Sequence, residues 1–324
     1  MKKSVWAYFI VALGAVSAAA AGEQINHTTT IASAADRESR SDSPYVPSGY
    51  EKIFSDEFDE TRLDESKWWT RFIYADGMLD YLNDEDERYR EHDNHVMTGH
   101  SLILMARKID GSSDGVKYSS GMIRSKTTFK FGYFESRIKV PRGLGVWPAF
   151  WLSSGRRSSD GRLAWPPEID FAELVNNGVE DTTHMLHMGA ISHDAQALKV
   201  LYTDPNFNTQ WVFWQAPYDF ADGFHVFGGL WDTDNTLSVY VDGQLLYKTE
   251  YKWVYDDGSP AGYANVILNL AIGGPKWAGR HGVDNAAFPQ GLEVDYVRVY
   301  QKTGQHKTEA DTTGRSLCPL GDGC

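Results

Sequence analysis

The chain has 324 residues, of which 44 are acidic and 31 are basic, and its formal net charge is −13. This length is enough to bury the core of one large domain or of two smaller ones. The acidic balance disfavours nucleic acids and anionic membranes as partners, because both carry negative charge. Aromatic side chains are plentiful, with 11 Trp, 17 Tyr and 15 Phe. Such a composition is typical of a β-sandwich, and of a groove that stacks on sugar rings.

Residues 1–21 have the pattern of a secretory signal peptide. Lys2 and Lys3 precede an apolar run from Val5 to Val16, and Ala19-Ala20-Ala21 is typical of a cleavage site. The apolar run is too short to span a membrane. We therefore expect a secreted or periplasmic protein.

Polar segments at the two ends bound one folded domain. Residues 22–46 are rich in Ser, Thr, Ala, Asp and Arg, which predicts a disordered linker. Residues 303–324 are polar again and predict a C-terminal tail. This tail holds the only two cysteines, Cys318 and Cys324, which can close a small loop but cannot cross-link a core. Residues 47–302 remain for the fold.

Short strands recur through this central region, and no long helical period interrupts them. In residues 133–140 apolar and polar side chains alternate, as in a strand with one buried face. Asp242-Gly243 predicts a type I′ hairpin. The pattern favours an all-β fold, a two-sheet β-jelly-roll sandwich. The predicted strands are residues 53–58, 102–106, 121–125, 133–140, 147–152, 168–175, 182–188, 210–214, 225–231, 237–241, 245–248, 264–270 and 293–300.

One of these strands carries three carboxylates within six residues, Glu168-Ile169-Asp170-Phe171-Ala172-Glu173. In a regular strand Glu168 and Asp170 share a face, and strict alternation sends Glu173 to the other face. One extra residue, a bulge near Phe171 or Ala172, would return Glu173 to the face of Glu168. We expect that bulge.

Two carboxylates on one face are the catalytic parts of a glycosidase, in which one attacks or activates water and the other protonates the leaving oxygen. Asp170 lies between them and can share a proton with Glu168, which shifts the pKa of its neighbours. The alternative is a solvated acidic strand, because 44 acidic residues make such triplets expected by chance. The apolar Ile169, Phe171 and Leu174 between the charges argue against that alternative.

Together with this strand, further motifs resemble glycoside hydrolase family 16, over about residues 50–301. The resemblance implies a β-jelly-roll with a substrate groove on its concave sheet and a retaining endo-hydrolase mechanism. The two-residue spacer between Asp170 and Glu173 resembles the branch with laminarinases, agarases and carrageenases. The other motifs are residues 55–58 (SDEF), 132–137 (GYFESR), 145–152 (GVWPAFWL), 240–243 (YVDG), 269–274 (NLAIGG) and 295–300 (DYVRVY).

By this resemblance Glu168 would be the nucleophile, Glu173 the acid/base, and Asp170 the residue that orients or tunes Glu168. Retention requires carboxyl groups roughly 5–5.5 Å apart. Residues five apart on a straight strand lie about 16 Å apart at their Cα atoms. The bulge, the curvature of the sheet and converging side chains must therefore close the gap.

Candidate substrate contacts come from the aromatic residues near this strand. Trp147 and Trp151 are four residues apart and share one face of a strand, so we expect Trp147 to stack on a sugar, with Trp151, Trp231 and Trp277 as further candidates. Either of the first two could instead be core.

Polar contacts are also implied by the resemblance. His187 matches a family histidine and could hydrogen-bond Asp170 or Glu173, although a histidine that only satisfies its own strand is the alternative. Asn83 and Glu85 resemble a loop segment that reaches the sugar in laminarinases. The glutamine usual there is replaced by Glu87.

Many family members bind a structural calcium ion away from the groove, and Glu57 and Asp295 match positions that contribute ligands. Calcium takes six to eight oxygen ligands, so other oxygens would have to complete the site. We expect no cofactor in catalysis.

The sequence therefore predicts a secreted, monomeric endo-β-1,3-glucanase or mixed β-1,3/1,4-glucanase that acts on a polysaccharide. The same mechanism on a succinoglycan-like exopolysaccharide, agar or carrageenan is an alternative, and Arg156, Arg157 and Arg162 could meet an anionic group there. A β-glucan-binding module without activity is another alternative. It would be expected to lack one catalytic carboxylate, and both are present.

Overall fold

The computed structural model describes residues 42–74, 77–111, 115–154, 165–191, 199–209 and 212–310. The predicted signal peptide, most of the predicted linker, Cys318, Cys324 and the arginines at positions 156, 157 and 162 lie outside these residues. Within the described part of the chain, no helix has both the length and the apolar character needed to cross a bilayer.

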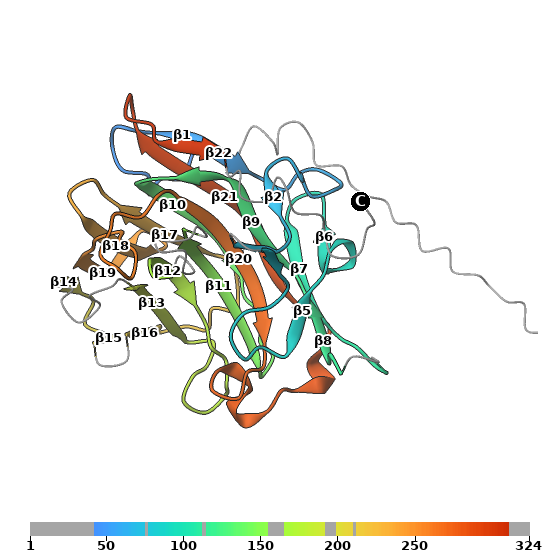
Figure 1. The fold of residues 1–324 in the computed structure, drawn as a ribbon. Helices are drawn as coiled ribbons and strands as arrows, with labels where there is room; N and C mark the ends of the chain where they lie inside the picture. Colours follow the sequence, from blue (N-terminus) through green and yellow to red (C-terminus); the bar gives the residue numbers. More distant parts are fainter. Residues whose placement is uncertain are drawn as a thin grey trace, which may run out of the picture.

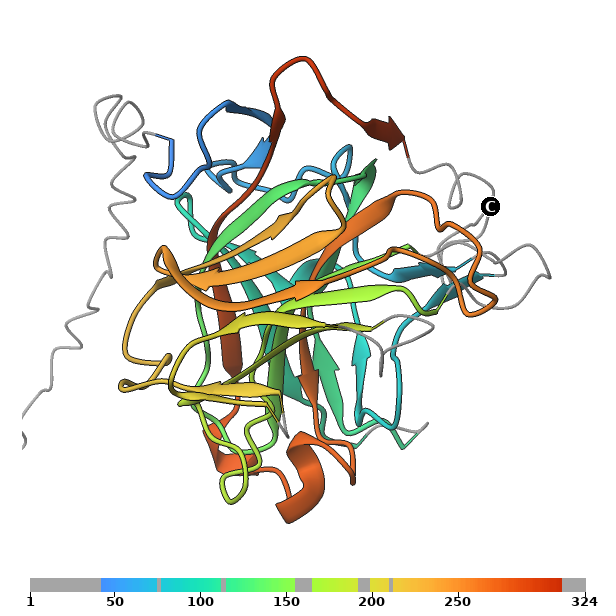
Figure 2. The ribbon, with the colours of Figure 1, turned by 90° about the vertical axis from the view of Figure 1, so that its left-hand side faces the viewer.

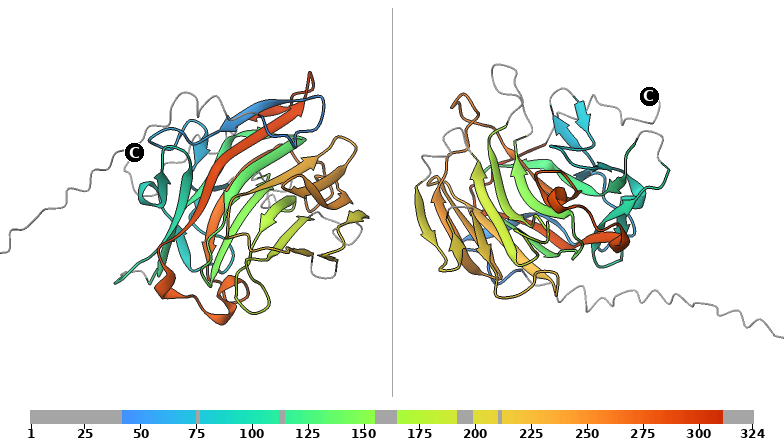
Figure 3. Two further views of the ribbon diagram at one scale, coloured as in Figure 1. Left: turned by 180° about the vertical axis from the view of Figure 1, so that it is seen from behind. Right: turned by 90° about the horizontal axis from the view of Figure 1, so that it is seen from below.

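Two curved sheets stack face to face and confirm the predicted all-β sandwich (Figure 1). The front sheet has nine strands in the described residues, in the order β15-β16-β13-β12-β11-β20-β9-β2, with β22 also paired to β9. The back sheet has eleven, in the order β14-β19-β18-β17-β10-β21-β7-β8-β5, with β1 paired to β21 and β6 to β7. Figure 3 shows this sandwich from behind and from below.

The strands of the front sheet are β2 (Trp68–Trp69), β9 (Met122–Phe129), β11 (Val146–Ser153), β12 (Glu168–Glu173), β13 (Met185–Ile191), β15 (Phe207–Asn208), β16 (Phe213–Gln215), β20 (Ala264–Ile272) and β22 (Thr308–Ala310). Those of the back sheet are β1 (Tyr50–Asp56), β5 (Glu87–Tyr89), β6 (His95–Met97), β7 (Leu102–Lys108), β8 (Tyr118–Ser120), β10 (Gly132–Lys139), β14 (Val200–Thr203), β17 (His225–Trp231), β18 (Thr236–Val241), β19 (Gln244–Glu250) and β21 (Gln290–Lys302). A small hairpin, β3 (Phe72–Tyr74) and β4 (Gly77–Leu79), and the 3-10 turns η1 (His92–Asn94), η3 (Ala278–His281) and η4 (Asn285–Ala287) complete the described elements.

The core lies between the two sheets and is built from alternate residues of their strands. On β12, Ile169 and Phe171 point into it and are fully buried. The ring of Phe171 stacks on Phe134 of β10, with 5.6 Å between ring centroids. It also lies over Gly229 of β17, where an added Cβ would meet the ring at 2.0 Å. The front and back sheets are therefore fitted together at β12.

The predicted hairpin turn is confirmed. Asp242 and Gly243 have φ values of 48° and 80°, and a type I′ turn requires positive φ at both central residues. Glycine adopts this conformation without strain, and Asp tolerates it better than most residues. The turn joins β18 to β19 at the side of the molecule that Figure 2 faces.

The described residues at both ends of the domain are tied to the sheets. Ser43, at the end of the predicted linker, is buried and hydrogen-bonds Glu135 of the back sheet. In the predicted tail, β22 pairs with β9, and the backbone N–H of Lys307 donates to the side chain of Gln301 at 2.7 Å. Polar segments can be held by hydrogen bonds to a strand or a buried carboxylate, which composition alone does not show.

Candidate active site

The register of β12 places its three carboxylates on one face of the front sheet. Their partners on β11 are the alternate residues Ser153, Trp151 and Ala149. Alternate residues of a strand share a face. The three acids of β12 lie opposite these residues of β11, so the acids also share one face. The register shifts by one residue at Phe171, against both β11 and β13. The predicted bulge is confirmed, and it returns Glu173 to the side of Glu168.

Burial raises the pKa of all three carboxyl groups above their ordinary values. For Glu168, burial and the charge of Glu173 raise the pKa to about 8, against hydrogen bonds from Trp165 and Asp170 that lower it. For Asp170, burial and the charges of Glu168 and Glu173 raise the pKa well above its usual range. A hydrogen bond between the two side chains contributes to both shifts, because it raises the pKa of Asp170 and lowers that of Glu168.

Two indole N–H groups hold the outer carboxylates. Trp165 Nε1 donates to Glu168 Oε2 at 3.1 Å, and Trp147 Nε1 donates to Glu173 Oε1 at 3.1 Å. The backbone carbonyl of Glu168 accepts a hydrogen bond from the hydroxyl of Tyr251 at 3.0 Å, and the same hydroxyl donates to the carbonyl of Ile191 at 3.2 Å. These contacts fix both ends of β12.

His187 lies directly opposite Glu173 on β13, so the two side chains share a face. Its ring nitrogen Nε2 hydrogen-bonds Asp181 Oδ1 at 2.6 Å, which is neither of the two partners, Asp170 and Glu173, that the sequence suggests. Burial raises the pKa of Glu173, while the charge of His187 lowers it, as does the hydrogen bond from Trp147. His187 therefore lies where a protonated ring acts on Glu173 through its charge.

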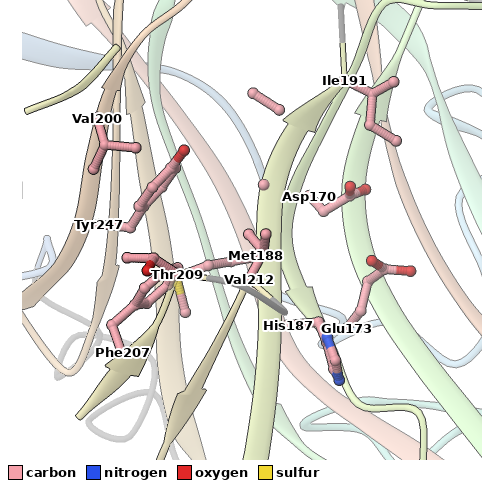
Figure 4. A pocket seen from close by; sticks show the side chains of 12 residues that line it. Asp170, Glu173, His187, Met188, Ile191, Val200, Phe207, Thr209, Val212 and Tyr247 are labelled. Atoms are coloured by element: carbon pink, nitrogen blue, oxygen red, sulfur yellow. The ribbon is translucent and has the colours of Figure 1, made fainter. Parts of the chain in front are cut away.

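A cleft of about 410 Å³ opens beside Asp170 and Glu173 (Figure 4). Figure 4 shows the carboxyl groups of Asp170 and Glu173 next to each other on one side of the cleft, and Val200, Phe207 and Tyr247 on the other. The titratable residues among its described lining are Asp170, Glu173 and His187, together with Tyr247, and this lining contains no Lys or Arg.

The predicted tryptophans occupy different environments. Trp147, which donates its indole N–H to Glu173, stacks on Trp277 with ring centroids 5.0 Å apart. Trp277 is 39% exposed. Trp151 lies on the same face as Trp147, is buried, packs against Phe72 and donates its N–H to Asn269 at 2.8 Å. Trp277 is thus the one of these three that combines stacking with access to solvent, whereas Trp147, 8% exposed, is as buried as Trp151.

Trp231 does not reach the cleft, so its predicted role is wrong. It belongs to β17 of the back sheet, is 1% exposed, and packs between Phe131 and Trp253 with ring centroids 5.0 and 4.8 Å away. The side chain points into the core because of its place on that strand. Its role is to pack the core.

The loop before β5 is only partly as predicted. Asn83 is exposed in a left-handed turn with φ of 52°, near the loop of Trp277, because the carbonyl of Asp84 lies beside Gly274. Glu85 turns inward: its Oε2 accepts the backbone N–H of Leu82 at 3.0 Å, and its carboxyl group hydrogen-bonds the fully buried Glu87. The prediction that Glu85 reaches a sugar is therefore wrong for this conformation.

The predicted calcium ligands do not fit a calcium site. Both oxygens of Glu57 accept from the guanidinium of Arg298, at 2.9 and 2.7 Å, and Asp295 Oδ2 accepts from Arg137 at 2.7 Å. A cation would have to displace these two guanidinium groups. Within the described ranges, no cluster of three His, Cys, Asp or Glu side chains is placed to hold a metal ion.

Three residues of this site were missed by the sequence analysis: Trp165, Asp181 and Tyr251. Trp165 stands three residues before Glu168 and could have been inferred from its spacing. The contacts of Asp181 and Tyr251 depend on how a loop and a distant strand fold back, which no local pattern indicates.

Comparison with known proteins agrees with this geometry. Residues 50–302 match the family described as "Beta-porphyranase A-D, GH16 domain". The chain belongs to glycoside hydrolase family 16. The family 16 match confirms the resemblance seen in the sequence motifs, and with it the β-jelly-roll topology of the sandwich.

Relatives within family 16 differ in the substrates that their names give. The chain is 31% identical to the beta-glucanase of Rhodothermus marinus over 269 residues, which cover 78% of this chain and 85% of that protein. It is 28% identical to the kappa-carrageenase of Pseudoalteromonas carrageenovora, over 62% of this chain and 51% of that protein. The crystal structure of SCLam, a non-specific endo-β-1,3(4)-glucanase of family 16, aligns with a TM-score of 0.60 at 30% identity and covers 79% of this chain and 93% of that one.

Proposed function

We propose that this family 16 hydrolase cleaves β-1,3-glucan, or mixed β-1,3/1,4-glucan, inside the polysaccharide and with retention of anomeric configuration. The bulged strand β12 supports the proposal most directly, because it brings Glu168 and Glu173 to one face of the sheet, where Glu173 and Asp170 line an open cleft. Two carboxylates that flank one glycosidic bond are what double displacement requires.

In the first step, a carboxylate oxygen of Glu168 forms a bond to the anomeric carbon while the bond to the leaving oxygen breaks. The proton of the Glu173 carboxyl group passes to that oxygen. In the second step, water attacks the anomeric carbon, gives a proton to Glu173 and releases Glu168. Asp170 stabilises the charged form of Glu168 through its hydrogen bond in the free enzyme.

The charge of the cleft favours a neutral substrate. Its described lining has no Lys or Arg, so none of those residues offers the positive charge that would pair with an anionic group on a sugar. The second candidate is a sulfated galactan, which the porphyranase description of the matched family favours. Initial rates of reducing-sugar release from laminarin, lichenan, agarose, porphyran, carrageenan and succinoglycan would decide between these classes.

The roles of the two glutamates can be tested separately. We expect Glu168→Ala and Glu173→Ala each to lower activity by about 10²–10⁴-fold or more. With azide added, an activated aryl glycoside should give the α-azide from the first variant and the β-azide from the second, because azide replaces a different group in each. If both variants keep the parental rate, or if NMR shows inversion in the parent, the mechanism is wrong.

We also propose export and a monomeric state. The signal pattern of residues 1–21 supports export. N-terminal sequencing of protein from the culture medium and light scattering of the purified enzyme would test the two points. Cleavage after a residue far from Ala21, or a dimer mass at working concentration, would contradict them.

A further inference from the structure

The loop between β12 and β13 is organised by two buried asparagines. Asn177 Oδ1 accepts the backbone N–H groups of Val179, Glu180 and Asp181 at 3.0, 3.0 and 3.1 Å. Asn176 Nδ2 donates to the carbonyls of Arg142 and Gly143 at 3.0 and 2.8 Å. The loop therefore has a fixed shape, although much of it lies at the surface.

The same loop is also held from outside. Glu180 Oε2 accepts from His281 Nε2 at 2.7 Å, and Arg280 lies 3.6 Å from Glu180 Oε1. Both partners belong to η3, which follows Trp277 and lies beside this loop at the bottom of Figures 1 and 2. Because neighbouring residues are anchored on both sides, the position of Asp181 is well defined.

Asp181 is the hydrogen-bond partner of the His187 ring. Asp181 Oδ1 lies 2.6 Å from His187 Nε2, and the side chains of Asp181 and His187 are 18% and 23% exposed. Across the sheet, His187 is the direct partner of Glu173. A carboxylate hydrogen-bonded to one ring nitrogen fixes the orientation of the ring.

We infer that Asp181 is a positioning residue, which holds the ring of His187 against Glu173 so that its charge stabilises the Glu173 carboxylate once that group has given up its proton. The inference rests on the proposed function. It adds no reactant: the proton still passes from Glu173 to the leaving oxygen, and the second step returns a proton from water.

The other groups near Glu173 do not replace this effect. Asp170 and Glu168 on β12 are acidic and oppose a second charge there. From β11, Trp147 offers a neutral N–H, and from β16 the ring of Phe213 lies 5.7 Å from the ring of His187. Of these neighbours, His187 alone can supply positive charge.

The test is the pH profile of kcat/KM, whose basic limb reports the acid/base group. If Asp181→Ala frees the ring, the pKa of Glu173 rises, so the basic limb should move up by about half a pH unit or more. At neutral pH kcat should fall about tenfold. Asp181→Asn keeps an acceptor for the ring and should stay within about threefold of the parent. His187→Gln should shift the limb as Asp181→Ala does.

The double variant separates positioning from a general loss of stability. Asp181→Ala in the His187→Gln background should add no further shift, because its effect passes through the ring. Asp242→Ala is the matched control, since Asp242 also binds a histidine, His225 at 2.7 Å, on the back sheet; its profile should equal that of the parent. If Asp181→Ala does not fold, Asp181→Ser, too short to reach the ring, must show the same shift.

A parental profile for Asp181→Ala, or a shift that persists without His187, would overturn the inference. The Glu173→Gln variant distinguishes a failure of the proposed function from a failure of the positioning role of Asp181. If that variant is fully active, the proposed function fails as well. If it is inactive while Asp181→Ala behaves as the parent, the positioning role alone is wrong.

Discussion

At the scale of single residues, Glu168 is costly to keep in a folded protein. Burial and the charge of Glu173 raise its pKa to about 8, whereas an unfolded glutamate has a pKa of about 4.3. At a pH above the pKa of the unfolded glutamate, ionisation of this carboxyl group lowers the free energy of the unfolded chain but not that of the folded protein. The destabilisation therefore grows as pH rises from about 4.5 to about 8, and it is absent at lower pH.

Glu168→Gln should remove this penalty. We expect the variant to be about 1–3 kcal/mol more stable than the parent at pH 7.5, with a difference that vanishes near pH 4.5. Urea unfolding at both pH values measures it. A gain in stability that is the same at both would mean that the carboxylate is not destabilised by its surroundings.

The acidic residues of the site could be predicted from the sequence, and their supports only in part. Period-two alternation was enough to group Glu168 with Asp170, and the family motif added Glu173. The hydrogen bond between His187 and Asp181 could not be predicted, because it depends on how Asn177 folds the intervening loop. Trp231 was placed wrongly because an aromatic residue in a strand gives no sign of which sheet or face it belongs to.

At the scale of elements, the bulge in β12 and the loop of Trp277 shape the site in different ways. The bulge was predictable, since the chemistry requires Glu173 on the same face as Glu168 and a regular strand forbids it. The loop was not, because its position beside Trp147 depends on Gly273 and Gly274, both with positive φ of 76°. Glycine adopts that conformation at little cost.

Trp277→Ala should weaken substrate binding without harming the chemical step. Its exposed ring, stacked on Trp147, is the natural platform for a sugar. We expect KM for laminarin to rise about five- to tenfold, with kcat changed less than about twofold. Tyr45→Ala, which removes a partly exposed ring that does not line the cleft, is the control. Unchanged KM in the Trp277 variant would remove it from the substrate site.

At the scale of the whole molecule, the sandwich architecture followed from strand count and turn signals, and most predicted strands lie within a few residues of their observed positions. The order of strands within each sheet did not follow from them. Pairs such as β10 with β21, and β11 with β20, join segments more than 100 residues apart, and local patterning carries no information about such partners. The ordered ends, through Ser43 and β22, depend on the same long-range contacts.

Gly229→Ala tests how closely the sheets are fitted. The added Cβ would lie 2.0 Å from the ring of Phe171, so the ring must move. We expect a loss of about 1–3 kcal/mol, a Tm lower by about 2–10 °C, and reduced kcat. At Gly223 an added Cβ meets nothing within 4 Å, so the Gly223→Ala variant should match the parent in Tm and in kcat. Equal melting curves for the two variants would contradict the tight fit.

The contact between Phe171 and Gly229 has a practical consequence for anyone who wishes to redesign this hydrolase. Phe171 is the inserted residue that turns Glu173 toward the polysaccharide, and its ring is seated in the opposite layer. Mutagenesis of β10 or β17, neither of which lines the cleft, therefore risks mis-aiming Glu173, the proposed proton donor.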